Sequence, residues 1–197
     1  MFITIASTTL IFPTISSYYS KNKIDAIRNL SHQAERYLSM LFFPAVAFIF
    51  IFAPQICHIL LGTKFLLSSP ILIILSFVVL VNGTTQPYTQ QIGGTNHIRL
   101  AAKLSGVVFA LNIILNFLFI PQEFLGMTLL GLGGIGAAFA TLISIAIGSL
   151  LFRFYAYKIT ASKPNPRILF HLVSALIMGI ILHVISASII TISVYYL

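Results

Sequence analysis

The chain reads Asn82-Gly83-Thr84-Thr85-Gln86-Pro87-Tyr88-Thr89-Gln90-Gln91 at the end of an otherwise apolar run that begins at Pro70. The whole segment is long enough for a helix to cross a bilayer, yet lipid tails cannot satisfy the carboxamides and hydroxyls of its second half. At helical spacing, Asn82, Gln86 and Gln90 share one stripe. A membrane helix with one polar face predicts an interior cavity, with the other helices packed around that face.

A bend is expected in the same helix. Pro87 removes one backbone hydrogen bond, and its ring crowds the carbonyl of Gly83, a residue that tolerates bending. The sequence therefore predicts a kink at Gly83 and Pro87, beside the polar stripe.

The composition of the chain excludes a soluble domain. Hydrophobic residues make up 58% of the 197 residues, charged residues make up 7%, and the mean hydropathy is +1.03. These values are typical of a polytopic membrane protein. The net charge of +8 does not indicate a nucleic-acid partner, because the cations lie in short gaps between apolar runs rather than on one water-filled face.

Six apolar runs alternate with polar gaps, which predicts an all-α polytopic membrane protein with about six transmembrane helices. In the first gap, Ile24, Ile27 and Leu30 recur at three-residue steps, so we expect a short amphipathic helix on the membrane surface. The runs cover residues 1–19, 38–61, 70–91, 100–120, 133–155 and 168–197.

The distribution of cations predicts the orientation. Every lysine and arginine except Lys64 falls at one set of alternate gaps, which identifies that set as cytoplasmic. Both ends of the chain then lie on the external side, and Met1 opens directly into an apolar run. We therefore expect the chain to be a fragment, with Met1 internal to a longer protein.

A ridge of small residues follows the glycine-rich sequence Gly131-Leu132-Gly133-Gly134-Ile135-Gly136. The glycines match a dinucleotide-binding pattern, but no strand precedes them and no acid lies about twenty residues further on. Instead Gly136, Ala140, Ser144 and Gly148 are spaced by four, which predicts close approach of a neighbouring membrane helix.

Asn112 and Asn116 lie four residues apart on the fourth predicted span and share a face. Two interpretations carry equal weight: hydrogen bonds between helices, or a shared lining of the cavity predicted from Asn82 and Gln86.

No catalytic or metal-binding set is evident. The acids Asp25, Glu35 and Glu123 lie outside the predicted spans, so no buried carboxylate is expected. The five histidines show no ligand spacing with each other or with Cys57. We therefore predict neither an enzyme, a metal site nor a cofactor. The histidines are His32, His58, His97, His171 and His183.

Several short motifs follow one another in a recognisable order between Leu10 and Arg153. Their order resembles the polysaccharide-transporter family, the oligosaccharide or O-antigen-type flippases, of the superfamily that also holds MATE drug exporters and lipid II flippases. The motifs are Phe12-Pro13-Thr14-Ile15-Ser16, Arg36-Tyr37 with Pro44, Leu61-Gly62 with Phe65, Asn112 to Pro121, and Gly133-Gly134-Ile135-Gly136-Ala137-Ala138 with Ala140-Thr141.

The resemblance implies a fold of two six-helix lobes around a cavity. Residues 1–157 would be the second lobe without its first helix, and residues 158–197 a cytoplasmic linker with an appended transmembrane helix. The missing N-terminal half of the same protein would supply the first lobe. The implied function is the export of a lipid-linked glycan across the cytoplasmic membrane of a prokaryote, in contact with membrane lipids.

The implied site has a glycan-binding part and a diphosphate-binding part. Neutral hydrogen-bonding walls suit a glycan, and cations near the cytoplasmic helix ends suit a lipid diphosphate, although topology signals explain those cations equally well. The glycan candidates are Asn82, Gln86, Gln90, Asn112 and Asn116, and the diphosphate candidates are Arg36, Arg99, Lys103 and Arg153.

Two alternatives remain open from the sequence. A cation-coupled drug antiporter of the same fold generally needs an ionisable group within the membrane, which this chain is not expected to hold. A non-catalytic membrane assembly subunit is the other alternative, and nothing in the sequence excludes it.

Overall fold

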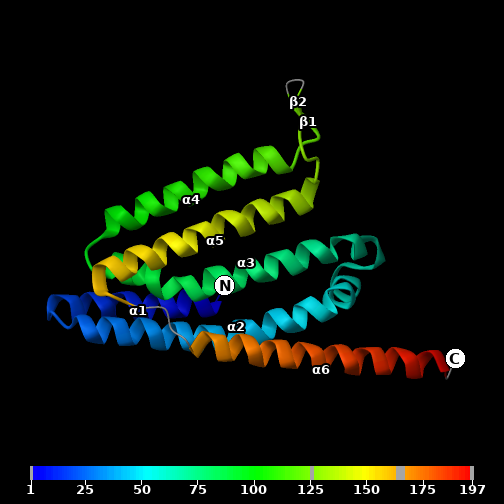
Figure 1. The fold of residues 1–197 in the computed structure, drawn as a ribbon, viewed down its shortest axis with the longest axis horizontal. Coiled ribbons are helices and arrows are strands. Elements are labelled where there is room, and N and C mark those ends of the chain that lie inside the picture. The colour runs from blue at the N-terminus through cyan, green and yellow to red at the C-terminus, as the bar shows by residue number, and fades with distance from the viewer. Residues whose placement is uncertain (1, 125–126, 163–166, 196–197) are drawn as a thin grey trace.

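The computed structural model describes residues 2–124, 127–162 and 167–195, which form a bundle of long helices (Figure 1). A two-stranded antiparallel hairpin projects beyond one end of the bundle, between the fourth and fifth long helices. The elements are α1 (Phe2–Ser20), α2 (Ile24–Leu61), the 3-10 helix η1 (Thr63–Ser68), α3 (Ser69–Gly94), α4 (Ile98–Phe119), β1 (Glu123–Phe124), β2 (Met127–Thr128), α5 (Gly133–Thr160) and α6 (Arg167–Tyr195).

Helix α3 occupies the middle of the bundle. It packs against α2 on one side and against α5 on the other, while α4 covers the far side of α5 and α6 covers the far side of α2 (Figure 1). Helix α1 packs against α3 and α2. In the polar half of α3, Thr84, Thr85, Tyr88 and Gln91 are buried among these helices. The predicted stripe is less enclosed, because Asn82 is exposed and Gln86 and Gln90 are half-buried.

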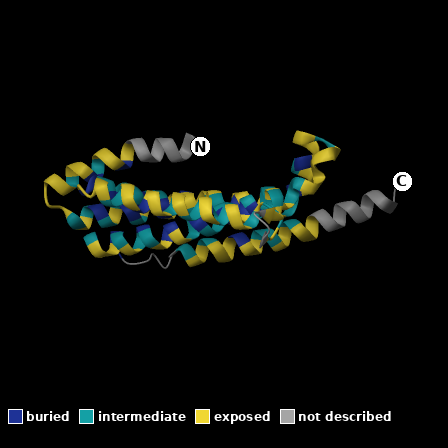
Figure 2. Cartoon of the chain, turned by 90° about the horizontal axis from the view of Figure 1, so that it is seen from above, coloured by how far each residue is buried: buried dark blue, intermediate teal, exposed yellow. Residues whose placement is uncertain are grey.

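The predicted fold class is confirmed. Within the described residues, five helical segments are long and apolar enough to cross a membrane: Ile24–Leu61, Thr63–Gly94, Ile98–Phe119, Gly133–Thr160 and Ile168–Ile185. The first predicted run forms the 19-residue helix α1, which is not among these five. Figure 2 shows exposed positions all along the outer faces of the helices, where large apolar side chains such as Leu150 (69% exposed) would contact lipid.

The sequence predicted a separate amphipathic helix on the membrane surface before the second run, and this prediction is wrong. The segment is the first part of α2, which continues without interruption for 38 residues, nearly twice what a span needs. The reason is packing: Ile27 is fully buried in a cluster with Ile11 and Ile15 of α1. The amphipathic face therefore covers a neighbouring helix rather than the membrane surface.

The cations gather at one end of the bundle. The α1–α2 and α3–α4 connections and the C-terminal end of α5 lie at that end (Figure 1), and these elements carry Lys21, Lys23, Arg99 and Lys158. The opposite end holds η1, with Lys64, and the hairpin.

The small-residue ridge on α5 packs against α4, which confirms the predicted helix contact. A Cβ atom added to Gly148 would lie 2.5 Å from Cγ2 of Val108, and one added to Gly136 would lie 2.5 Å from the carbonyl oxygen of Phe119. All four ridge residues are buried. Larger side chains at the two glycines would force α4 away from α5.

Candidate functional site

A cavity of about 390 Å³ lies between α3, α4 and α5. Each of the three helices contributes carboxamides or hydroxyls to its wall, and no charged side chain is among the described residues that line it. The apolar part of the wall includes Val108, Phe109, Ile145 and Phe152. Its polar lining is Asn82, Thr85, Gln86, Thr89, Ser105, Asn112, Thr141, Ser144 and Ser149.

Hydroxyl groups in the wall are held by helix backbone and by each other. Thr85 donates to the carbonyl of Val81 at 2.6 Å and forms a 2.7 Å bond with the hydroxyl of Ser149, which joins α3 to α5. The neighbouring Thr84, which does not line the cavity, donates to the carbonyl of Leu80 at 2.9 Å. Because a backbone carbonyl accepts each of these protons, the threonines are tolerated inside a membrane helix.

The cavity brings together three of the five predicted glycan-facing residues. Asn82, Gln86 and Asn112 line it, whereas Gln90 and Asn116 are not among its lining residues. Gln90 donates to the side chain of Gln86 at 3.5 Å, and Asn116 donates to that of Asn112 at 3.0 Å. These two residues therefore lie one turn behind residues that face the cavity.

Asn112 combines the two interpretations that the sequence left open. Its amide donates across the helix interface to Ser144 at 3.2 Å and to Thr141 at 3.4 Å. The same side chain lines the cavity. The interhelical bonds thus fix the orientation of a wall residue.

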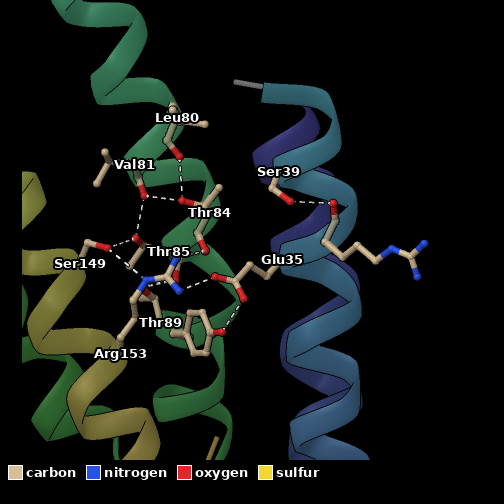
Figure 3. Close-up of polar contacts among 11 residues, drawn as sticks. Glu35, Ser39, Leu80, Val81, Thr84, Thr85, Thr89, Ser149 and Arg153 are labelled. Carbon is tan, nitrogen blue, oxygen red and sulfur yellow. Dashed lines mark hydrogen bonds and ion pairs between the residues drawn. The ribbon is translucent and has the colours of Figure 1, made fainter. Parts of the chain in front are cut away.

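An ion pair that the sequence did not predict lies beside this cavity (Figure 3). Arg153 of α5 donates to Oε1 of Glu35 of α2, and the Tyr88 hydroxyl of α3 donates to Oε2 of Glu35 at 2.6 Å. The guanidinium carbon of Arg153 lies 4.7 Å from the centre of the Tyr88 ring. Three helices are joined through one carboxylate.

The expectation that the chain holds no buried carboxylate is wrong, because the Glu35 side chain is 0% exposed. Glu35 was assigned to a polar gap, but in α2 it lies on the buried face with Ile27, Ser31 and Leu38. These positions are spaced by three and four residues, the repeat of one helix face. That spacing was the available signal in the sequence.

Arg153 also contacts the wall of the cavity. Its Nε donates to Ser149 at 3.4 Å and its Nη2 donates to the carbonyl of Thr84 at 3.3 Å. Arg153 lines a second cavity of about 300 Å³ together with Tyr88, Phe154, Tyr157 and Ser162. The guanidinium therefore lies between the two cavities.

The other predicted diphosphate ligands are not brought together with Arg153. Arg36, Arg99 and Lys103 are exposed. Arg36 lies on α2 and the other two on α4, and these helices are separated by α3 and α5 (Figure 1). Of the four predicted cations, only Arg153 lines one of these cavities.

A second polar cluster ties the C-terminal end of α5 to α3 and α2. The buried amide of Gln91 donates to the hydroxyl of Thr160 and, at 3.2 Å, to that of Ser162. Arg28 donates to the carbonyl of Thr160 at 2.9 Å. Thr160 is the last residue of α5, so its carbonyl has no partner inside the helix, and Arg28 supplies the missing donor.

The predicted kink remains a prediction. Helix α3 continues through Pro87 to Gly94. Gly83 has a separate role, because a Cβ atom there would overlap the ring of Phe42 on α2. Any larger residue at this position would have to displace the Phe42 ring.

A bundle of membrane-length helices around a polar, uncharged cavity defines a multi-pass membrane protein with an internal polar site. Comparison with known families makes the class specific: the family described as lipid II flippase MurJ matches residues 1–197, and the chain belongs to this family. It is a multi-pass cell-membrane protein of prokaryotic type.

The chain is also similar to the probable low-salt glycan biosynthesis flippase Agl15 of the archaeon Haloferax volcanii. The two are 30% identical over 159 residues, which cover 81% of this chain and 31% of the relative. The chain thus spans about a third of the length of this relative. No solved structure matches the chain.

The comparisons confirm the predicted superfamily of flippases and refine its branch. The match is to the lipid II flippases, whereas the sequence motifs were taken to resemble the polysaccharide transporters.

Proposed function

We propose that the protein moves a lipid-linked oligosaccharide or polysaccharide precursor across the cytoplasmic membrane for the synthesis of cell-surface glycans. The observation that carries this proposal is the polar, uncharged wall of the cavity between α3, α4 and α5. Sugar hydroxyls both donate and accept hydrogen bonds, and carboxamide and hydroxyl side chains do the same. The names of the family and of the haloarchaeal relative support a lipid-linked glycan as substrate.

The proposed architecture follows the resemblance to two-lobed flippases. Residues 1–157 form the second lobe, residues 158–197 contribute a linker and an appended helix, and an N-terminal half completes the transport pathway. The coverage of only 31% of the haloarchaeal relative supports a larger assembly of helices.

The charged part of the substrate is proposed to meet Arg153. Its side chain is 28% exposed and lines the second cavity, so part of the guanidinium faces an open space. Arg36, Arg99 and Lys103 are exposed near the cation-rich end, where they suit phospholipid headgroups. A substrate diphosphate would thus bind Arg153 between the helices, and phospholipid headgroups would bind the other three cations.

One observation favours a second candidate, a cation-coupled antiporter of the same fold. Glu35 is a buried carboxylate, the group that such coupling generally needs. However, Arg153 and Tyr88 already occupy both of its oxygens. The carboxylate is therefore neutralised by the protein, which favours the glycan transporter.

The function can be tested with the native protein in proteoliposomes that hold a fluorescent polyprenyl diphosphate oligosaccharide in both leaflets. An impermeant reductant quenches the outer leaflet, so transport appears as additional quenching over time. We expect faster loss of the glycolipid signal than in empty vesicles. Fluorescent phosphatidylcholine in the inner leaflet should not be transported, so its signal should stay protected from the reductant. Equal rates with and without protein, or equal movement of phosphatidylcholine, would contradict the proposal.

A further inference from the structure

Glu35 lines neither cavity, yet both of its carboxylate oxygens accept hydrogen bonds from other helices. The structure describes all three acidic residues, and of these Glu35 is buried whereas Asp25 and Glu123 are exposed. Helix α2, which carries it, supplies no lining residue to either cavity. A carboxylate that is 0% exposed cannot meet a substrate in this arrangement. Any influence on transport must pass through the groups that it binds.

We propose that Glu35 is a positioning residue for the transport pathway, acting through Arg153. It holds the guanidinium in the seam between α3 and α5, from where Arg153 fixes the wall of the large cavity and faces the small one. The inference rests on the proposed function, because it assigns a role within transport.

The first step of the argument is the placement of the arginine donors. A guanidinium has five N–H groups in one plane. Three of them are directed to Glu35, to the carbonyl of Thr84 and to the hydroxyl of Ser149. Two donors are thus left over, on a side chain that lines the second cavity.

The second step is the link to the large cavity. Ser149 accepts from Arg153 and shares a 2.7 Å hydrogen bond with the Thr85 hydroxyl (Figure 3). Both Ser149 and Thr85 line that cavity. A displaced Arg153 would remove one of the two bonds that hold the Ser149 hydroxyl. The position of one guanidinium therefore affects both cavities.

The third step is the fixing of the arginine by Glu35. An arginine side chain has many rotamers, and without a partner its cationic end moves toward water. Glu35 lacks such freedom because Tyr88 holds its second oxygen, while the Tyr88 ring faces the guanidinium. Removing the carboxylate would leave an unpaired cation between helices, which drives Arg153 out of the seam.

The test begins with Glu35→Gln in the native protein and the glycolipid assay. We expect transport per folded molecule to fall about ten- to a hundredfold, the range for loss of a hydrogen bond to a charged group. Glu35→Asp keeps the charge and should retain more activity than Glu35→Gln. The matched control is Glu123→Gln, the same change at an exposed carboxylate in the hairpin, which should transport like wild type.

Dependence on the arginine separates positioning from a structural role. If Glu35 acts through Arg153, the double variant Glu35→Gln/Arg153→Gln should transport at the rate of Arg153→Gln alone. Multiplied losses in the double variant would overturn the proposal. Where Glu35→Gln is not recovered folded, Tyr88→Phe keeps both charges and removes one bond of the carboxylate, and the same comparison with Arg153→Gln applies.

A chemical readout makes the two proposals distinguishable. Phenylglyoxal modification followed by peptide mass spectrometry reports the accessibility of each arginine. Arg153 should react faster in Glu35→Gln than in wild type, whereas the exposed Arg36, which lies on α2 next to Glu35, should react equally in both. Unchanged reactivity of Arg153 would overturn the positioning role even in a working flippase. Increased reactivity in a protein that moves no glycolipid would instead count against the proposed function.

Discussion

At the scale of single residues, orientation decides which polar side chains of α3 take part in the site. Gln86 and Gln90 are one helical turn apart and have the same chemistry, but Gln86 lines the cavity and Gln90 does not. Both are half-buried, so exposure alone does not separate them.

Gln86→Leu should lower glycolipid transport per folded molecule about tenfold, because a substrate hydroxyl would lose its partner. The amount of folded protein should change little, since leucine is favourable in a membrane helix. Gln90→Leu should lose much less activity. The glycolipid assay, normalised to folded protein, measures both, and equal losses would mean that the whole stripe rather than the cavity wall matters.

Gln91 has a structural role, in contrast to Gln86. Its fully buried amide holds Thr160 and Ser162, so Gln91→Leu leaves these hydroxyls with fewer partners. We expect a loss of about 1–3 kcal/mol in the free energy of unfolding. The melting temperature in detergent reports this loss, with the exposed Gln33→Leu as control; indistinguishable melting of the two variants would contradict the assignment.

Residue-scale features were only partly predictable. The four-residue spacing indicated that Asn82 and Gln86 face inward, because helix periodicity is a local property. It could not exclude Gln90, since the end of the cavity depends on where α4 and α5 lie. The helical spacing of Ile27, Glu35 and Leu38 indicated a buried face, but the ion pair of Glu35 could not be predicted, because Tyr88 and Arg153 come from two other helices.

At the scale of helices, the contact between α4 and α5 depends on the absence of side chains at particular positions. Gly148 faces Val108, whereas Gly106 of α4 has no atom within 4 Å of an added Cβ. Gly106 can therefore serve as the control position for a substitution at Gly148.

Gly148→Ala should destabilise the protein by about 1–3 kcal/mol, because the new methyl group collides with Val108. Gly106→Ala should be neutral or stabilise the protein by up to ~1 kcal/mol, since alanine favours a helix over glycine. Melting temperatures of the two variants in the same detergent provide the measurement. Destabilisation of similar size in both would mean that helix propensity, not the α4–α5 contact, governs these sites.

The helices themselves were largely predictable, since each apolar run became a helix within a few residues. The length of α2 was not, because charged residues between positions 20 and 36 indicated a gap. Burial of Ile27 against α1 overrides that local signal.

At the scale of the whole molecule, alternate ends of the bundle should face opposite sides of the membrane. In a variant without Cys57, single cysteines at Lys64 and Glu123 should react with an impermeant maleimide on intact cells. Cysteines at Lys21 and Arg99 should react only after the membrane is opened. Labelling of the latter pair from outside would reverse the orientation derived from the cations.

The class of the molecule followed from composition and from the order of its runs. The spatial order α4, α5, α3, α2, α6 did not, because every apolar helix face is equally compatible with lipid or with another helix. Only the small-residue ridge on α5 marked one contact in advance.

That ridge has an evolutionary consequence. Outward positions of α5, such as Leu150, need only be apolar, so substitutions among leucine, isoleucine, valine and phenylalanine should accumulate there freely. Positions Gly136, Ala140, Ser144 and Gly148 can accept only residues of their own size. Among diverging relatives, α5 should therefore vary with a period close to the helical repeat, with its minima at these four positions. A survey of natural variants in which Gly148 changes as often as Leu150 would contradict this expectation.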